Sequence, residues 1–115
     1  MIYICNSFSL AMLPEWRLTD SDTETSIRIQ PVDPIVWLTD AETRHGAAVS
    51  AVGHADTAIV FSEQLARAVP LNRSTVQLGE DDELLIGQLI GGRLPEGATS
   101  LPENFKINWL VISFL

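Results

Sequence analysis

His54 is the residue of this sequence that is best placed to do chemistry. It follows Gly53 at the end of a short apolar run, and the amphipathic stretch after it predicts a helix. The N-terminus of a helix presents backbone N–H groups that have no intrahelical partner, and these groups favour a bound phosphate. An imidazole at such a corner could exchange a proton with a phosphodiester. A surface or capping histidine is the alternative interpretation.

Other kinds of site have little support in the sequence. The soft or borderline metal ligands are Cys5, His45 and His54, and their spacing matches no zinc motif. There is no Walker loop, no dinucleotide fingerprint and no G-x-S-x-G elbow. The sequence therefore predicts no metal site, no cofactor and no serine-hydrolase triad.

Composition narrows the choice of partners. The chain has 115 residues, of which 46% are hydrophobic and 19% charged, as expected for one globular domain over residues 1–115. Seven basic residues against fifteen acidic ones give a net charge of −8, which argues against binding to long nucleic acid but leaves a small anionic ligand open. No apolar run reaches the roughly 20 residues of a membrane helix. With a single cysteine and no signal-like start, we expect a cytoplasmic protein without a membrane partner.

Hydrophobic periodicity predicts the elements that must position these residues. Apolar or alternating runs predict strands over residues 2–5, 26–30, 47–52, 74–78, 83–90 and 107–114. A helical turn is expected at residues 10–13 and a helix at 56–68 with Ile59, Val60, Leu65 and Ala66 near one face, closed by Pro70. Residues 34–43, capped by Asp33, favour a helix, although a strand would suit them nearly as well.

These elements predict an α/β fold: a single small domain with a mixed sheet of about five strands flanked by helices. An acidic turn at residues 79–82 is expected to join two antiparallel strands. Both terminal strands are almost free of charge, so we expect them in the middle of the sheet or covered by another subunit, as in a homodimer.

Three polar loops follow predicted strands, at residues 6–9, at Gly53–His54 and at residues 91–97. Ligand sites of α/β folds lie preferentially at strand ends, so loops that leave the same side of the sheet would converge on one site. Without further information, Arg93 is also interpretable as a surface charge, Glu96 as a turn residue, and Asn6 and Ser9 as caps of the turn that follows them.

Together the three loops resemble those of the small viral and bacterial ring nucleases that include the type III anti-CRISPR proteins. Residues 6–13, NSFSLAML, are similar to the family motif N-A-F-S-[IL]-N-M-L. Residues 52–57, VGHADT, are similar to I-G-H-x-[ST]. Residues 88–97 resemble Q-x-x-x-R-L-x-E-G and follow a predicted hairpin that opens with Asn72-Arg73. The resemblance covers most of the chain, with the motifs in the family's order.

The resemblance implies a homodimer that binds cyclic tetra-adenylate and cleaves it without metal, by attack of a ribose 2′-OH on its own phosphorus to leave a 2′,3′-cyclic phosphate. It implies His54 as general acid, Arg93 as the group that stabilises the phosphate charge, and Glu96 as the residue that orients Arg93, His54 or a ribose hydroxyl. The remaining motif residues would bind the ligand; these are Asn6, Ser7, Phe8, Ser9, Gly53 and Gln88.

The sequence departs from the family motifs at three points. Ala11 replaces a polar residue, Ala55-Asp56 replaces a common Asp-Ser pair, and the Gly91-Gly92 bend adds one residue before Arg93. Two other functions stay open: a protein that sequesters the cyclic nucleotide without cleaving it, and a structural or regulatory dimer that binds a protein partner.

Overall fold

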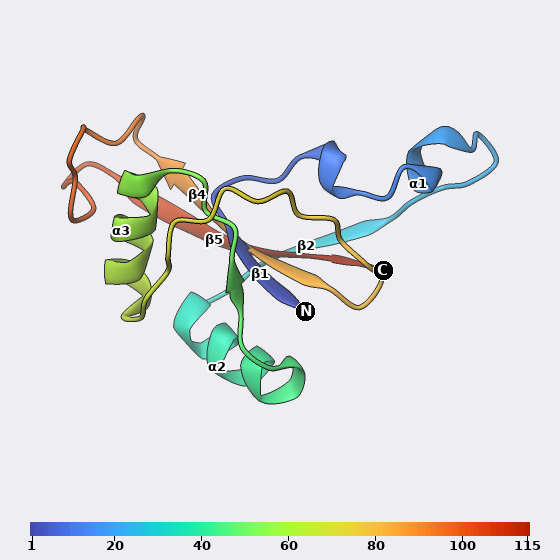
Figure 1. Cartoon of the computed structure of the whole chain (residues 1–115), viewed down its shortest axis with the longest axis horizontal. Helices are drawn as coiled ribbons and strands as arrows, with labels where there is room; N and C mark the ends of the chain where they lie inside the picture. The colour runs from blue at the N-terminus through green and yellow to red at the C-terminus, as the bar shows by residue number, and fades with distance from the viewer.

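The architecture is a five-stranded mixed sheet with the two longer helices on one face, as described by a computed structural model of residues 1–115 (Figure 1). The strands are β1 (Ile2–Cys5), β2 (Ile27–Pro31), β3 (Val49–Ser50), β4 (Glu83–Ile90) and β5 (Lys106–Phe114), in the order β2-β5-β4-β1-β3. The helices are η1 (Leu10–Met12), α1 (Trp16–Thr19), α2 (Pro34–His45) and α3 (Ala55–Leu65). The predicted α/β class and the strand number are therefore confirmed.

The three strands β4, β1 and β3 run parallel to one another, whereas β5 is antiparallel to both β4 and β2. The two terminal strands, β1 and β5, both lie inside the sheet, as their almost uncharged sequences predicted. Because parallel neighbours end at the same edge, the loops after β1, β3 and β4 leave the sheet together. The fold thus brings the starts of the three polar loops to one edge.

Two apolar clusters cover the two faces of the sheet. On one face α2 and α3 pack Leu38, Phe61 and Leu65 against Ile4 and Leu85. On the other face Val76 and Leu78 pack against strand residues that include Cys5, Leu84, Ile86 and Ile112. Burial raises the pKa of the Cys5 thiol to about 11, in keeping with its expected role as a small apolar residue.

Helix α2 begins as its sequence predicted. The Asp33 carboxylate accepts hydrogen bonds from the backbone N–H groups of Ile35 and Val36, and Pro34 occupies the first turn. The helix runs two residues past the predicted Thr43, to His45, and Gly46 ends it with a φ of 87°. The helix interpretation of residues 34–43 is therefore correct and the strand alternative is wrong.

The predicted strand over residues 74–78 is wrong. These residues make no hydrogen bonds to a neighbouring strand. In the turn after them the Gly79 N–H donates to the Asp82 carboxylate, and this turn does not join two antiparallel strands. Apolar and polar residues alternate here because Val76 and Leu78 pack on the face of the sheet and the residue between them does not. A strand paired at the edge of the sheet would show the same alternation. The hairpin expected to open at Asn72-Arg73 is consequently absent.

Helix α3 ends earlier than predicted, at Leu65 instead of residue 68. Ala66 takes the left-handed conformation, with a φ of 53°, so the helix ends before Pro70 is reached. The residue after this bend, Arg67, forms a bidentate pair with Glu42 of α2. That hydrogen-bonded pairing lowers the pKa of Glu42 and raises the pKa of Arg67.

The buried face of α3 differs in part from the prediction. Val60 and Leu65 are buried as expected, but Ile59 is 46% exposed and Ala66 is also exposed. Their places in the core are taken by Ala58 and Phe61. The predicted strand over residues 47–52 likewise shortens to β3, with an isolated bridge from Val52 to Leu71.

The molecule is elongated, with α3 and the loop before β5 at one end and α1 at the other (Figure 1). No helix in the structure is both long and apolar enough to span a bilayer.

Candidate functional site

The corner that carries His54 is fixed by the chain that follows α3. The Asn72 side chain donates to the Ser50 carbonyl (2.7 Å), and the Asn72 N–H donates to the Val52 carbonyl (2.9 Å). Arg73 Nε donates to the Gly53 carbonyl at 2.9 Å. Asn72 and Arg73 were singled out in the sequence only as the start of a predicted hairpin. In the structure they hold the backbone just before His54.

His54 is the N-cap residue of α3. Its backbone is extended, with φ −124° and ψ 130°, and its carbonyl accepts the Ala58 N–H. Its imidazole makes no capping hydrogen bond and is exposed, so it is free to meet a ligand. The adjacent backbone N–H groups of the first turn of α3 lack intrahelical partners, as at any helix N-terminus.

The loop after β4 approaches α3 from the neighbouring part of the sheet. Gly91 and Gly92 start this loop with φ angles of 130° and 114°, and a Cβ at Gly91 would lie 2.9 Å from Phe105 Cγ. This bend, which includes the residue extra to the family motif, carries Arg93 toward α3. Arg93 makes no ion pair, in contrast to Arg17, Arg44 and Arg67, which pair with carboxylates.

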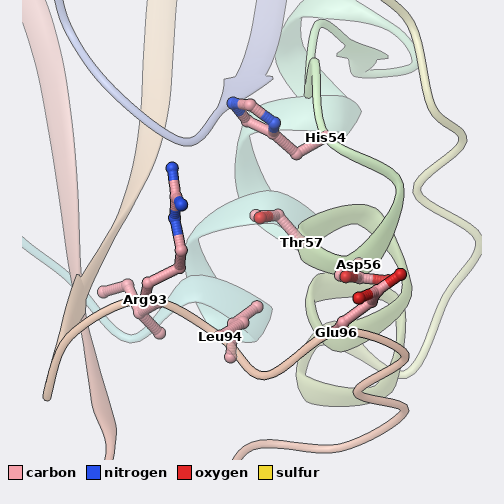
Figure 2. Close-up of a pocket in the computed structure, with 7 residues that line it drawn as sticks. His54, Asp56, Thr57, Arg93, Leu94 and Glu96 are labelled. Atoms are coloured by element: carbon pink, nitrogen blue, oxygen red, sulfur yellow. The ribbon is translucent and has the colours of Figure 1, made fainter.

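The corner and the loop border a solvent-open cavity of about 610 Å³. Figure 2 shows the His54 imidazole, the Thr57 hydroxyl and the Arg93 guanidinium pointing into the same space. The Asp56 carboxylate points instead toward the loop that carries Glu96, and accepts the Gly97 N–H at 3.3 Å. The cavity is lined by residues of α3, β4 and the loop after β4: His54, Asp56, Thr57, Leu89, Arg93, Leu94 and Glu96.

The structure thus brings together the three residues predicted for catalysis, His54, Arg93 and Glu96. Glu96 forms no ion pair or hydrogen bond with Arg93 or His54, so in this arrangement it orients neither of them. The third suggested role of Glu96, contact with a ribose hydroxyl, stays a prediction. The cavity therefore offers a cationic side for a phosphate and an acidic side for hydroxyl or amino donors.

Gln88 does not line the cavity. Successive strand residues point to opposite faces of the sheet, and Leu89 of β4 lines the cavity, so Gln88 lies on the other face. There its side-chain oxygen accepts a hydrogen bond from Asn108 at 3.3 Å.

The loop after β1 leaves the same edge as the cavity but contributes no lining residue. Ser9 caps η1 by accepting the Ala11 N–H at 3.1 Å, and Phe8 packs against the apolar cluster of the opposite face. Asn6 is partly buried and Ser7 is exposed, and neither side chain has a hydrogen-bond partner. Gly53 directly precedes His54 in the chain but is not one of the residues that line the cavity.

Asp56 and Thr57 are lining residues that were not predicted as site residues. Their signal is positional, because residues in the first turn of a helix surround its N-terminus together with the N-cap residue. No three His, Cys, Asp or Glu side chains come together in an arrangement that could hold a metal ion.

Comparison with known proteins identifies a family that matches the chain and a solved structure with a similar fold. The family model described as STIV B116-like matches residues 2–110 of the chain. Among solved structures, the chain is similar to B116 of Sulfolobus turreted icosahedral virus, with a TM-score of 0.73 and 24% sequence identity over 97% of each chain. No curated protein matches the sequence.

Proposed function

The chain belongs to the STIV B116-like family, and from this premise we propose that it is a metal-independent ring nuclease that binds and cleaves cyclic tetra-adenylate. The observation that carries the proposal is the pairing of His54 and Arg93 across one cavity at the N-terminus of α3. Neither side chain is engaged by the protein, and both are suited to a phosphodiester. The activity would remove the second messenger of type III CRISPR systems.

The proposed reaction breaks one P–O5′ bond. The ribose 2′-oxygen attacks the adjacent phosphorus, its proton passes to water, and the leaving 5′-oxygen takes a proton from the His54 imidazolium. Arg93 and the free N–H groups of α3 stabilise the negative charge that develops on the phosphate oxygens. The product is a linear chain with a 2′,3′-cyclic phosphate, and His54 regains its proton from solvent.

The acidic side of the cavity fits the rest of a nucleotide. A carboxylate accepts hydrogen bonds from ribose hydroxyls, and Glu96 has no partner in the protein that would compete for it. The site therefore separates a phosphate position, between His54 and Arg93, from a sugar position beside Glu96.

We further propose that the active form is a homodimer. A cavity of about 610 Å³ is of the size used for single small ligands, and a ring of four nucleotides is larger than such a ligand. A second copy related by a two-fold axis would supply a second His54 and Arg93 to a two-fold symmetric ring. A monomeric mass in sedimentation equilibrium, both with and without the ring, would contradict this part.

The test is single-turnover incubation of cyclic tetra-adenylate with excess protein in EDTA. We expect linear product with a 2′,3′-cyclic phosphate end, and a fall of about 100-fold or more in rate for His54→Ala. His45→Ala is the matched control, because the other histidine lies at the end of α2 beside Glu83 and outside the cavity.

Each alternative function gives a different result. Absence of product from the wild-type protein, with a ligand-induced rise in melting temperature, would replace cleavage by sequestration. Absence of both would favour a dimer that binds a protein partner. Cleavage by His54→Ala at the wild-type rate would refute the assigned mechanism even if activity stands.

A further inference from the structure

The loop over residues 91–105 is joined to the rest of the chain by one hydrogen bond. Gly97 N–H donates to Asp56 Oδ2 at 3.3 Å, which links the loop to the first turn of α3. The other hydrogen bonds of this loop are internal, from Ala98 to Pro95 and from Phe105 to Pro102. Asp56 is therefore the polar tie between the two parts of the chain that form the cavity.

The two parts carry different members of the proposed catalytic pair. His54 begins α3, whereas Arg93 and Glu96 lie on the loop. No hydrogen bond or ion pair connects His54 with Arg93, so their relative placement depends on how the loop is held against the helix. Gly97 meets Asp56 with a φ of 77°, a conformation that L side chains rarely adopt.

A carboxylate at this position has opposite effects on the helix and on the ligand. In the first turn of α3 its negative charge is favourable toward the helix dipole. In a cavity that binds a phosphate, the same charge repels the ligand. An acidic residue that lines this cavity and accepts the Gly97 N–H is therefore explained better by the loop than by the ligand.

We propose that Asp56 is a positioning residue, whose carboxylate holds the loop of residues 91–97 against α3 so that Arg93 faces His54. This role rests on the proposed nuclease function, although the contact itself does not. Asp56 touches no reacting atom, and its effect on the reaction passes through Arg93.

Two substitutions separate the contact from the charge. Asp56→Asn keeps an oxygen that accepts the Gly97 N–H and removes the negative charge, whereas Asp56→Ala removes both. Glu63→Ala is the matched control, because Glu63 is an exposed carboxylate on the same helix that does not line the cavity. Melting temperatures establish that each variant is folded before it is compared.

The first measurement is hydrogen exchange of the Gly97 amide in the protein without ligand. We expect faster exchange in Asp56→Ala, and exchange near the wild-type rate in Asp56→Asn and Glu63→Ala. The second is the single-turnover cleavage rate at saturating cyclic tetra-adenylate. Misplacement of a catalytic group by about 1 Å costs up to about 100-fold, so we expect a fall of roughly 10- to 100-fold for Asp56→Ala. We expect Asp56→Asn to lose less of the rate than Asp56→Ala does, and to bind the ring more tightly.

Equal Gly97 exchange in the wild type and in Asp56→Ala would overturn the proposal, as would equal cleavage rates at saturation. An Asp56→Asn variant as slow as Asp56→Ala would also contradict it, since the charge and not the contact would then matter. If the wild-type protein cleaves nothing, the nuclease function fails separately. The positioning role is then decided by the exchange of the Gly97 amide, which should be faster in Asp56→Ala than in the wild type and in Asp56→Asn.

Discussion

Gly87, at the middle of β4, tests how α3 is positioned on the sheet. A Cβ at this position would lie 2.4 Å from Phe61 Cζ and 2.8 Å from Trp109 Cζ3, whereas carbon atoms in good contact are about 3.5 to 4.0 Å apart. The Phe61 side chain is 1% exposed, and its ring centroid is 4.9 Å from that of Trp109. Trp109 is partly exposed, but the buried Phe61 ring has no solvent to move into, so Gly87→Ala must displace this ring and with it α3.

The expected cost follows from two opposing effects. Overpacking a filled core costs about 1 to 3 kcal/mol, and replacing a flexible glycine within a strand returns about 0.5 to 1 kcal/mol. We therefore expect Gly87→Ala to lose about 1 to 2 kcal/mol of unfolding free energy, or roughly 5 to 10 °C in melting temperature for a domain of this size. Urea unfolding, monitored by circular dichroism, measures the loss. Because His54 begins α3, we also expect slower single-turnover cleavage.

A second substitution identifies the cause. Phe61→Leu removes the ring atoms Cζ and Cε2 that a Cβ at Gly87 would meet, and by itself it should cost about 1 to 2 kcal/mol. The double variant should lose less unfolding free energy than the sum of the two single-variant losses, because the leucine leaves room for the new methyl group. A Gly87→Ala protein as stable as the wild type, or two strictly additive losses, would refute this explanation of the glycine.

Two further predictions concern the corner of His54 and the contact between α2 and α3. Gly53 needs no glycine conformation, and a Cβ there would lie 3.8 Å from Arg73 Cγ, so Gly53→Ala should change the unfolding free energy by less than about 0.5 kcal/mol; a clear loss in a thermal melt would contradict this. The pKa of Glu42 is held below its ordinary value of 4.5 chiefly by the hydrogen bond from Arg67, so the stabilisation is present at neutral pH and is lost as pH falls through the lowered pKa. Glu42→Gln should therefore be less stable at pH 7 and lose less stability between about pH 5 and pH 3, as urea titrations at each pH would measure.

The parts of the fold that the sequence predicts well are those with a local physical cause. Strand β4 was predicted over its observed residues because its apolar run is buried on both faces. Helix α2 was predicted because Asp33 caps it and Pro34 fits its first turn. The end of α3 could not be predicted, since it depends on contacts far apart in sequence, such as that of Arg67 with Glu42. Residues 74–78 were wrongly predicted as a strand, because a segment that packs on the face of a sheet and a strand paired at its edge show the same alternation of apolar and polar residues.

The same distinction applies to the site. His54 and the loop of Arg93 were expected at one edge only on the condition that their loops leave the same side of the sheet, and the parallel pairing of β3, β1 and β4 meets that condition. Gln88 was expected at the site from motif order, but a single step of strand alternation places it on the opposite face from Leu89. The role of Asp56 could not be predicted from the sequence, because it depends on the hydrogen bond from the Gly97 N–H, which joins residues 41 positions apart.

The charges of the molecule explain how an acidic protein can offer a site for an anion. The net charge of −8 opposes any extended polyanion, because affinity for long nucleic acid depends on many separate cationic contacts. A cavity needs only local charges, and here three of the arginines, Arg17, Arg44 and Arg67, are paired with carboxylates elsewhere in the fold. Arg93, like Arg28 and Arg73, pairs with no carboxylate, and it lies across the cavity from His54 on a loop that Asp56 ties to the same helix. Under the proposed function, the two nearby carboxylates are compatible with an anionic ligand only if it presents its phosphate to Arg93 and hydroxyl or amino groups to Glu96, so we expect a nucleotide to bind better than inorganic phosphate.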